Sequence, residues 1–192
     1  MPRKKQYSES EVIDKAVNAF WEHGYAATSI RHLESEMGIN PFSIYSSFGS
    51  KKGVFIKALE QYKSQVKHIF LSDLLKSDGN INDIRKFLLA FVNSVKSGKT
   101  PNGCLMANTA MDMGSKDKEI KLQLKSFFKL LKEVFIDVLK KAKSKKQISK
   151  TANIEGYANF LVVCTEGLAV TAKVLEERDL NDFVEVTIKT LK

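Results

Sequence analysis

Hydrophobic residues recur at helical spacing along most of the chain, and no apolar run alternates with polar residues over a useful strand length. The first face begins after Ser8, which with Glu11 forms an S-x-x-E capping box, a pattern typical of a helix start. Gly24 follows this face and suits the position just after a helix end. The inward positions are Val12, Ile13, Ala16, Val17 and Phe20. This pattern predicts a first helix between Ser8 and Gly24.

Two shorter helices follow, joined by a turn at Gly38, where glycine can adopt a positive φ without steric cost. Thr28 and Asn40 each stand just before one of them and are good N-cap residues. The apolar positions are Ile30, Leu33 and Met37 in one and Ile44 and Phe48 in the other. Helices this short are unstable alone, so both must pack on the first helix. The helix after Asn40 has small, polar residues on its outward face. An arrangement of this kind can place the end of a helix in the major groove of DNA.

Beyond Lys51 the chain reads as a run of helices, separated by Asp78-Gly79-Asn80 and by the loop of residues 97–103. We expect these helices over residues 51–75, 82–96, 104–113, 117 to the lysine cluster near 140, 151–176 and 181–191. The sequence therefore predicts an all-α fold, with an N-terminal three-helix helix-turn-helix domain and a second helical domain after it.

A set of residues in the N-terminal unit occurs in a familiar order and spacing. The set is Phe20, Gly24-Tyr25, Thr28-Ser29-Ile30, Gly38-Ile39, Ile44-Tyr45, Phe48 and Ser50-Lys51. It resembles the N-terminal domain of the TetR family of bacterial transcriptional regulators. The resemblance implies a DNA-binding domain in residues 1–66, with the helix-turn-helix motif at about 29–48, and an effector-binding and dimerisation domain in residues 67–192. It also implies a sequence-specific repressor, not an enzyme, that a small-molecule or thiol-reactive effector releases from its operator.

In such a unit the second short helix presents its N-terminal residues to the bases. By the resemblance, Phe42 and Ser43 lie nearest the bases, whereas Tyr45 and Lys51 contact phosphates. Thr28 offers a phosphate its hydroxyl group or its backbone amide. The full set of expected DNA contacts is Thr28, Ser29, Arg31, Asn40, Pro41, Phe42, Ser43, Tyr45, Ser46 and Lys51.

This reading face departs from the commoner family pattern, which often has a basic and a small residue where Pro41-Phe42 stands. Because the face holds no Arg or Lys, bidentate recognition of guanine is excluded. Contacts of Phe42 with thymine methyl groups instead predict an operator rich in A·T pairs. Two alternatives stay open: Phe42 tucks against the three-helix unit, or Arg31 pairs with Glu34 or Ser35 rather than with a phosphate.

The resemblance also implies a homodimer on a palindromic operator, because family members pair through their last two long helices. The chain offers one continuous helical seam, stepping by 4, 3, 4, 3 and 4 residues, made of Gly156, Phe160, Val163, Gly167, Val170 and Val174. The alternative interpretation is a seam that faces the protein's own core, since any buried helix shows this spacing.

Effector-binding residues are harder to assign, because aromatic residues at helical spacing serve equally well as ordinary core. The candidates are Tyr62, Phe87, Phe91, Cys104, Met106, Asn108, Met111, Phe127, Phe128 and Leu131. Cys104 stands in the segment Gly103 to Ala110, which resembles a signature of one TetR subgroup with cysteine-based sensors. A thiol at a helix start gains from the positive end of the helix dipole, so we expect a lowered pKa. The alternative is a buried, inert thiol.

Composition and charge add limits. The net charge of +9 suits a polyanionic partner, yet residues 1–52 hold seven basic and six acidic side chains, a net +1, and much of the excess lies at Lys140 to Lys150. No run of eighteen apolar residues is present, and no apolar segment follows the basic N-terminus, so we expect neither membrane span nor signal peptide. Two cysteines without framework spacing indicate a reduced, cytoplasmic protein. We expect no metal and no cofactor.

A second class of function remains: a DNA-bound architectural or partner-docking protein without a small-molecule ligand. An internal pocket would favour the regulator, whereas a solid core with an exposed apolar patch would favour the docking protein.

Overall fold

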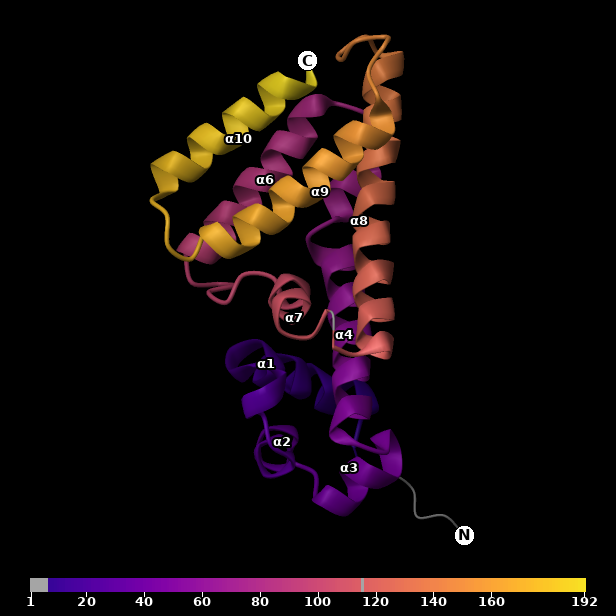
Figure 1. Ribbon diagram of the computed structural model, residues 1–192, viewed down its shortest axis with the longest axis vertical. Coiled ribbons are helices and arrows are strands. Elements are labelled where there is room, and N and C mark those ends of the chain that lie inside the picture. The colour runs from indigo at the N-terminus through magenta and orange to yellow at the C-terminus, as the bar shows by residue number, and fades with distance from the viewer. Residues whose placement is uncertain (1–6, 115) are drawn as a thin grey trace.

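The structure, a computed structural model, describes residues 7–114 and 116–192. Those residues form ten helices and no strand, which confirms the all-α prediction (Figure 1). The helices are α1 (Glu9–Ala27), α2 (Ile30–Met37), α3 (Pro41–Phe48), α4 (Lys51–Ile69), α5 (Ser72–Lys76), α6 (Ile81–Lys96), α7 (Leu105–Met113), α8 (Lys118–Ser144), α9 (Ile154–Thr171) and α10 (Glu177–Leu191).

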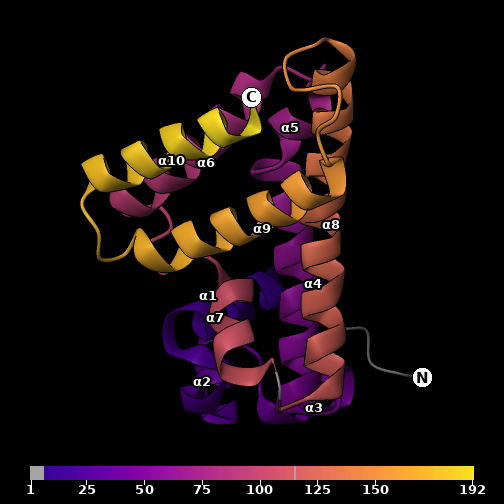
Figure 2. The ribbon, with the colours of Figure 1, turned by 45° about the horizontal axis from the view of Figure 1, so that its top comes forward.

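The first three helices form a small unit at one end of the molecule, and we call this unit the head (Figure 1). Its core brings together Phe20, Leu33 and Ile44, which are almost completely buried. Helix α4 begins in the head and runs out of it beside α8, so it joins the two predicted domains across residue 66 (Figures 1 and 2). The predicted three-helix unit is therefore present and is supported by the start of α4.

Most helix ends in the head lie at the residues that the sequence predicted. The Ser8 hydroxyl accepts a hydrogen bond from the Glu11 amide, and Gly24, with φ 76°, interrupts α1 where its end was expected. Gly38 adopts a left-handed conformation with φ 69°, as the predicted turn requires. Positive φ costs glycine little, so both breaks are compatible with well-packed helices on either side.

The N-cap of α2 is a correction, because it is Ser29 and not Thr28. The Ser29 hydroxyl accepts a hydrogen bond from the His32 amide at 3.0 Å. Thr28 is fully buried, and its hydroxyl donates to the carbonyl oxygen of Gly24 at 2.7 Å. Its side chain therefore closes the end of α1 and is turned away from any partner outside the head.

The expected helix over residues 51–75 is also corrected, because α4 ends at Ile69 and a separate short helix, α5, follows. The amides of both Phe70 and Leu71 donate to the carbonyl oxygen of Val66, which ends the regular pattern. Leu71 then turns into the core with 1% exposure, whereas Ile69, which the helical spacing of apolar residues from Val54 to Val66 would place on the buried face, is 68% exposed. The helical spacing of apolar residues continues past Ile69, which is why the sequence predicts one long helix. The chain breaks there because the break allows Leu71 and Leu74 to be buried.

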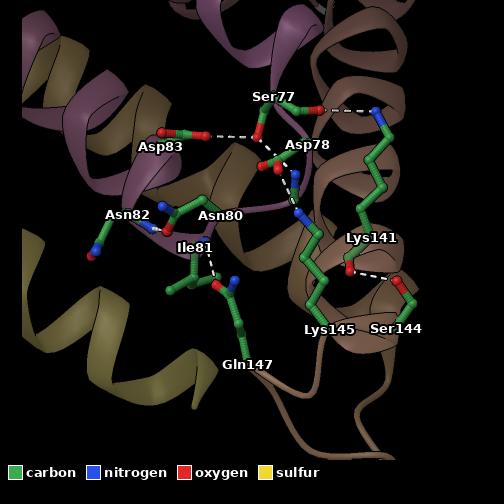
Figure 3. A network of polar contacts seen from close by, with 11 residues as sticks. Ser77, Asp78, Asn80, Ile81, Asn82, Asp83, Lys141, Ser144, Lys145 and Gln147 are labelled. Atoms are coloured by element: carbon green, nitrogen blue, oxygen red, sulfur yellow. Dashed lines mark hydrogen bonds and ion pairs between the residues drawn. The ribbon is translucent and has the colours of Figure 1, made fainter.

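Polar contacts fasten the start of α6 to the end of α8 (Figure 3). The Ser77 hydroxyl donates to Asp83 at 2.8 Å, and Lys141 donates to the Ser77 carbonyl oxygen at 3.0 Å. Lys145 pairs with Asp78, and the Gln147 side chain accepts from the Ile81 amide at 2.8 Å. Part of the lysine cluster therefore has a structural role within the second domain.

Among the described residues, none of the helices has the length and apolar character needed to cross a membrane.

Candidate DNA-reading face, internal cavity and apolar helix face

Helix α3 is held by one buried anchor and capped by its first residues. Ile44 is fully buried, so it fixes the helix on the head. The Asn40 side chain accepts a hydrogen bond from the Ser43 amide at 2.9 Å, and Pro41 occupies the first turn, where its missing amide hydrogen costs nothing. The predicted N-cap at Asn40 is confirmed, and the N-terminal end of α3 points away from the rest of the molecule (Figure 1).

The exposed residues of α3 include two aromatic side chains. Phe42 is 82% exposed and Tyr45 is 50% exposed, so Phe42 does not tuck against the head. The hydroxyl of Ser46, which is also exposed, donates to the carbonyl oxygen of Ser43 at 3.2 Å. The tip of α3 thus presents one large apolar side chain surrounded by hydroxyl groups, as the sequence suggested.

Two basic residues of the predicted DNA-contacting set, Arg31 and Lys51, differ in the contacts that they make within the protein. Arg31 is exposed and, among the described residues, makes no ion pair or hydrogen bond with Glu34 or Ser35, so the alternative pairing is not formed. Lys51 instead donates to the carbonyl oxygen of Ala26 at 3.3 Å and lies 4.4 Å from the centre of the Tyr25 ring. Partial burial lowers the pKa of Lys51. To reach a phosphate, Lys51 would have to leave these contacts.

Sequence reasoning missed one residue beside α3. The hydroxyl groups of Tyr7 and Ser47 lie 2.8 Å apart, so Tyr7, two residues before α1 begins, contacts α3. No local sequence pattern indicates a contact between residues forty positions apart, and this one forms only because α1 and α3 both pack on α4.

The second domain contains a small internal cavity of about 30 Å³, enough for one or two water molecules. Its lining is mostly apolar and aromatic: Tyr62, Val66, Phe70, Leu71, Phe87, Phe91, Thr100, Gly103, Cys104, Phe127, Leu131, Thr165, Glu166 and Ala169. Six of the ten predicted effector residues lie in this lining: Tyr62, Phe87, Phe91, Cys104, Phe127 and Leu131.

The other four candidates lie elsewhere. Met111 is 62% exposed, and Met106 is fully buried in the core away from the lining. Asn108 donates to the Asn102 carbonyl oxygen and accepts from Lys173, while Phe128 packs at the edge of the core. Helical spacing could not separate these residues from the lining, because it does not show which neighbouring helix each one meets.

Cys104 is the N-cap of α7, as expected, but its predicted low pKa is wrong. Complete burial, with a smaller contribution from the nearby Glu166 carboxylate, raises the pKa of the thiol from 9.0 to about 12. The amides at the helix start and the Tyr62 hydroxyl only partly oppose this. Loss of hydration therefore outweighs the helix dipole at this position.

Glu166 is the cavity residue that sequence reasoning missed. Burial raises the pKa of its carboxyl group from 4.5 to about 7, and a hydrogen bond from the Cys104 thiol lowers it in part. The sequence could have pointed to it, because Glu166 is an acidic residue in a mostly apolar helix, next to Thr165 and close to the buried Leu168 and Ala169.

The predicted dimer seam lies on the outer side of α9, so it does not face the protein's own core. Val163 is 70% exposed, and Phe160 and Val170 are 37% and 38% exposed. A side chain at Gly167 would meet no atom within 4 Å, whereas one at Gly156 would crowd the capping Asn153. Val174 is 79% exposed but follows the end of α9, which is shorter than expected.

Helix α10 also carries exposed apolar side chains, since Phe183 and Val186 are 40% and 60% exposed. We refer to Phe160, Val163, Gly167, Val170, Phe183 and Val186 as the apolar face. Helix α10 packs mainly on α6 and also contacts α9, and all three helices lie in the part of the molecule away from the head (Figure 1).

Comparison with known proteins agrees with this architecture. Residues 12–58 match the family described as bacterial regulatory proteins, tetR family, and residues 81–186 match the tetracyclin repressor-like C-terminal domain. The chain is 27% identical over 194 residues to the uncharacterized HTH-type transcriptional regulator YezE of Bacillus subtilis (strain 168), covering 100% of both. It is 25% identical over 191 residues to the HTH-type transcriptional repressor ComR of Escherichia coli (strain K12), covering 99% of this chain and 90% of that protein.

Solved structures share the fold. A cysteine mutant of the TetR family regulator CifR, complexed with a 26-base-pair operator, has a TM-score of 0.87 at 24% identity, covering 99% of this chain and 100% of that one. A TetR regulator from Chloroflexus aurantiacus has a TM-score of 0.82 at 20% identity, covering 94% and 93%. Because family models match both domains, the C-terminal one over more than half of the chain, this protein belongs to the TetR family of bacterial transcriptional regulators and is a DNA-binding regulator, not an enzyme.

Proposed function

We propose that this protein is a homodimeric repressor that reads a palindromic operator with α3 and leaves it when an effector occupies the internal cavity. The observation that carries the proposal is the tip of α3, where Phe42 is 82% exposed while Ile44 behind it is fully buried. An isolated phenyl ring in water has no role in stability, but it fits the methyl groups that thymine presents in the major groove. Ser43, Ser46 and Tyr45 supply hydroxyl groups around it.

A dimer follows from the apolar face. Exposed Val163 and Val186 on neighbouring helices form a patch that a second copy can cover, and Gly167 lets the two backbones approach closely. Two-fold pairing would place two heads about 34–36 Å apart, one turn of DNA. If each head neutralises roughly three phosphates, the logarithm of affinity should fall with the logarithm of salt concentration with a slope of about −5.

Helix α7 links the cavity to the head. Its N-cap residue, Cys104, lies in the cavity lining, and the amide of its first residue, Leu105, donates to the Tyr62 hydroxyl at 3.3 Å. It packs on α1, with Asp112 beside Gly24. Asp117 and Glu119, which follow α7 in the chain, form ion pairs with Lys52 of α4 at 3.4 and 2.8 Å. An effector that widens the cavity would displace α7 and, with it, the head. Coupling of this kind is typically worth about 1–3 kcal/mol.

A thiol-reactive effector is a second candidate, favoured by the presence of Cys104 in the lining. Because the thiol is buried and protonated, only a compound that first enters the cavity could react with it. A DNA-binding regulator of this kind acts in the cytoplasm, where bacterial DNA lies. A protein that docks a different partner on the apolar face is the remaining alternative.

The test is to select duplexes from random DNA with the purified protein and to measure binding to the selected sequence. We expect a palindromic, A·T-leaning site and binding by dimers. A protein that prefers no duplex at low ionic strength would contradict DNA reading by α3, and a monomer in solution would contradict the dimer. Treatment of a Cys104→Ser variant with electrophiles separates the two kinds of effector, because retained release excludes reaction at that thiol.

A further inference from the structure

One carboxylate oxygen in the cavity has no partner. Glu166 lies in the middle of α9 and lines the cavity, and its Oε2 atom is buried without a hydrogen bond to any described residue. The Cys104 thiol donates a hydrogen bond to the carboxyl group, and the Tyr62 hydroxyl is close enough for the Glu166 charge to raise the Tyr62 pKa. A buried acceptor without a donor destabilises the fold, so a lone carboxylate at this point calls for a complementary group.

The protein does not supply that group. The cavity lining contains no Lys, Arg or His. Lys173, which lies near Gly103 of the lining, donates to Asn108 at 3.0 Å instead. Glu166 therefore carries the one carboxyl group of the lining, and no cationic side chain of the lining faces it.

Aromatic rings form the other walls. Tyr62, Phe87 and Phe127 line the cavity together with Phe91 and Phe70. The Tyr62 and Phe127 ring centres are 6.5 Å apart. Ring faces attract cations, and the effect grows when the cation is removed from water. An acid at one point with rings around it is complementary to a positive head group attached to an apolar body.

We propose that the cavity is a binding site for an organic ammonium compound, with its charged nitrogen against Glu166 and its apolar body among the aromatic rings. The inference rests on the proposed effector role of this cavity and names the chemical class of the effector. An anion would meet the Glu166 carboxylate with like charge. A neutral compound without a donor would leave Oε2 unpaired.

The size of the cavity limits how such a compound fits. A volume of about 30 Å³ holds an ammonium group but no large body, so binding requires some wall residues to move. Phe70 and Phe87 are the candidates, because both also line an outer groove of about 420 Å³ beside α5 and α6. Phe70 lies at the break between α4 and α5, where no regular helix holds it.

Three probes of one shape but different charge test the proposal: benzylammonium, benzyl alcohol and benzoate. Binding to the full-length protein is measured by calorimetry near pH 8, where Glu166 is mostly ionised. We expect benzylammonium to bind at least tenfold more tightly than benzyl alcohol, and benzoate not to bind. Glu166→Gln should weaken the ammonium at least tenfold and leave the alcohol unchanged.

Glu155→Gln is the matched control, since it removes one carboxylate from the same helix at an exposed position paired with Lys132. It should leave all three affinities unchanged. Equal binding of benzylammonium and benzyl alcohol, no binding of benzylammonium at millimolar concentration, or an unchanged Glu166→Gln variant would each overturn the proposal.

The same samples distinguish this inference from the proposed function. If benzylammonium binds through Glu166 but leaves the operator complex intact, the cation site stands and effector release fails. If another compound releases the operator while benzylammonium does not bind, the regulator stands and the ammonium class is wrong.

Discussion

The indole ring of Trp21 meets the Tyr62 ring edge-on, with ring centres 5.3 Å apart and an angle of 72° between their planes. Trp21 belongs to α1 of the head, while Tyr62 belongs to α4 and lines the cavity. This pair is a direct contact between the DNA-binding unit and the cavity wall. Because Trp21 is the only tryptophan of the chain, its fluorescence reports on both.

The Tyr62 hydroxyl should contribute measurably to stability. Tyr62→Phe removes the acceptor of the buried Leu105 amide and leaves that donor unpaired. We expect a loss of about 1–3 kcal/mol in the free energy of unfolding, measured by urea denaturation followed through Trp21 fluorescence. Tyr45→Phe, which alters a half-exposed ring, is the control and should be neutral. Equal stability of the two variants would contradict a structural role for this bond.

Phe42 should matter for DNA and not for folding. Phe42→Ala removes a side chain that is 82% exposed, so the unfolding free energy should stay within about 0.5 kcal/mol. Operator affinity should fall at least tenfold, with a smaller loss on random DNA, in a titration at fixed salt. Ile44→Ala is the contrast, because its fully buried side chain should cost about 2–5 kcal/mol of stability. An unchanged operator affinity in Phe42→Ala would remove Phe42 from the reading face.

A charge on the apolar face should separate the subunits. Val163→Glu would place a carboxylate near its symmetry mate, so we expect at least a hundredfold weaker dimerisation by analytical ultracentrifugation, together with loss of operator binding. Leu122→Glu changes an apolar side chain that is 65% exposed on α8 and should leave the dimer intact. If both variants remain dimeric, the pairing surface lies elsewhere.

Stability should depend on pH through Glu166. Its pKa is about 7 in the folded protein against an ordinary 4.5, so the folded state binds more protons between these values and stability falls as pH rises through them. Above this window the burial of the charge costs on the order of 3 kcal/mol. Glu166→Gln should therefore gain stability over the wild type near pH 8 and lose that advantage near pH 4.5, in urea denaturation. A pH-independent difference would show that Glu166 is not ionised inside the fold.

Cys104 should resist alkylation in the folded protein. A pKa raised from 9.0 to about 12 lowers the thiolate fraction near pH 8 on the order of 1000-fold, and burial slows access further. Iodoacetamide labelling mapped by mass spectrometry should find Cys104 unmodified until urea unfolds the chain. Rapid labelling of the native protein would contradict the raised pKa and support the reactive thiol expected from the helix dipole.

The sequence was informative wherever local chemistry decides the structure. Asn40, Gly38 and Asp117 mark helix boundaries through their own side chains or backbone freedom, and each lies where expected. Prediction failed where burial decides. Thr28 looks like a cap but is enclosed by α1, and Ile69 continues a helical stripe but points outward.

The same limit applies to the cavity. Tyr62 and Met111 share the same apolar and periodic signal, yet one lines the cavity and the other is exposed. Glu166 belongs to no sequence motif, and its environment becomes visible only where α4, α6, α8, α9 and the loop before α7 meet around the cavity.

The lysines fastened between α6 and α8 lie at the end of the molecule opposite α3 (Figure 1). The basic cluster from Lys140 to Lys150 is therefore offset from the proposed reading face on α3. Long-range electrostatic attraction between the basic protein and DNA then raises the rate of encounter but does not orient α3 toward the DNA. Correct alignment must then come from the short-range fit of the two heads, so recognition should depend on the spacing of half-sites more strongly than on total charge.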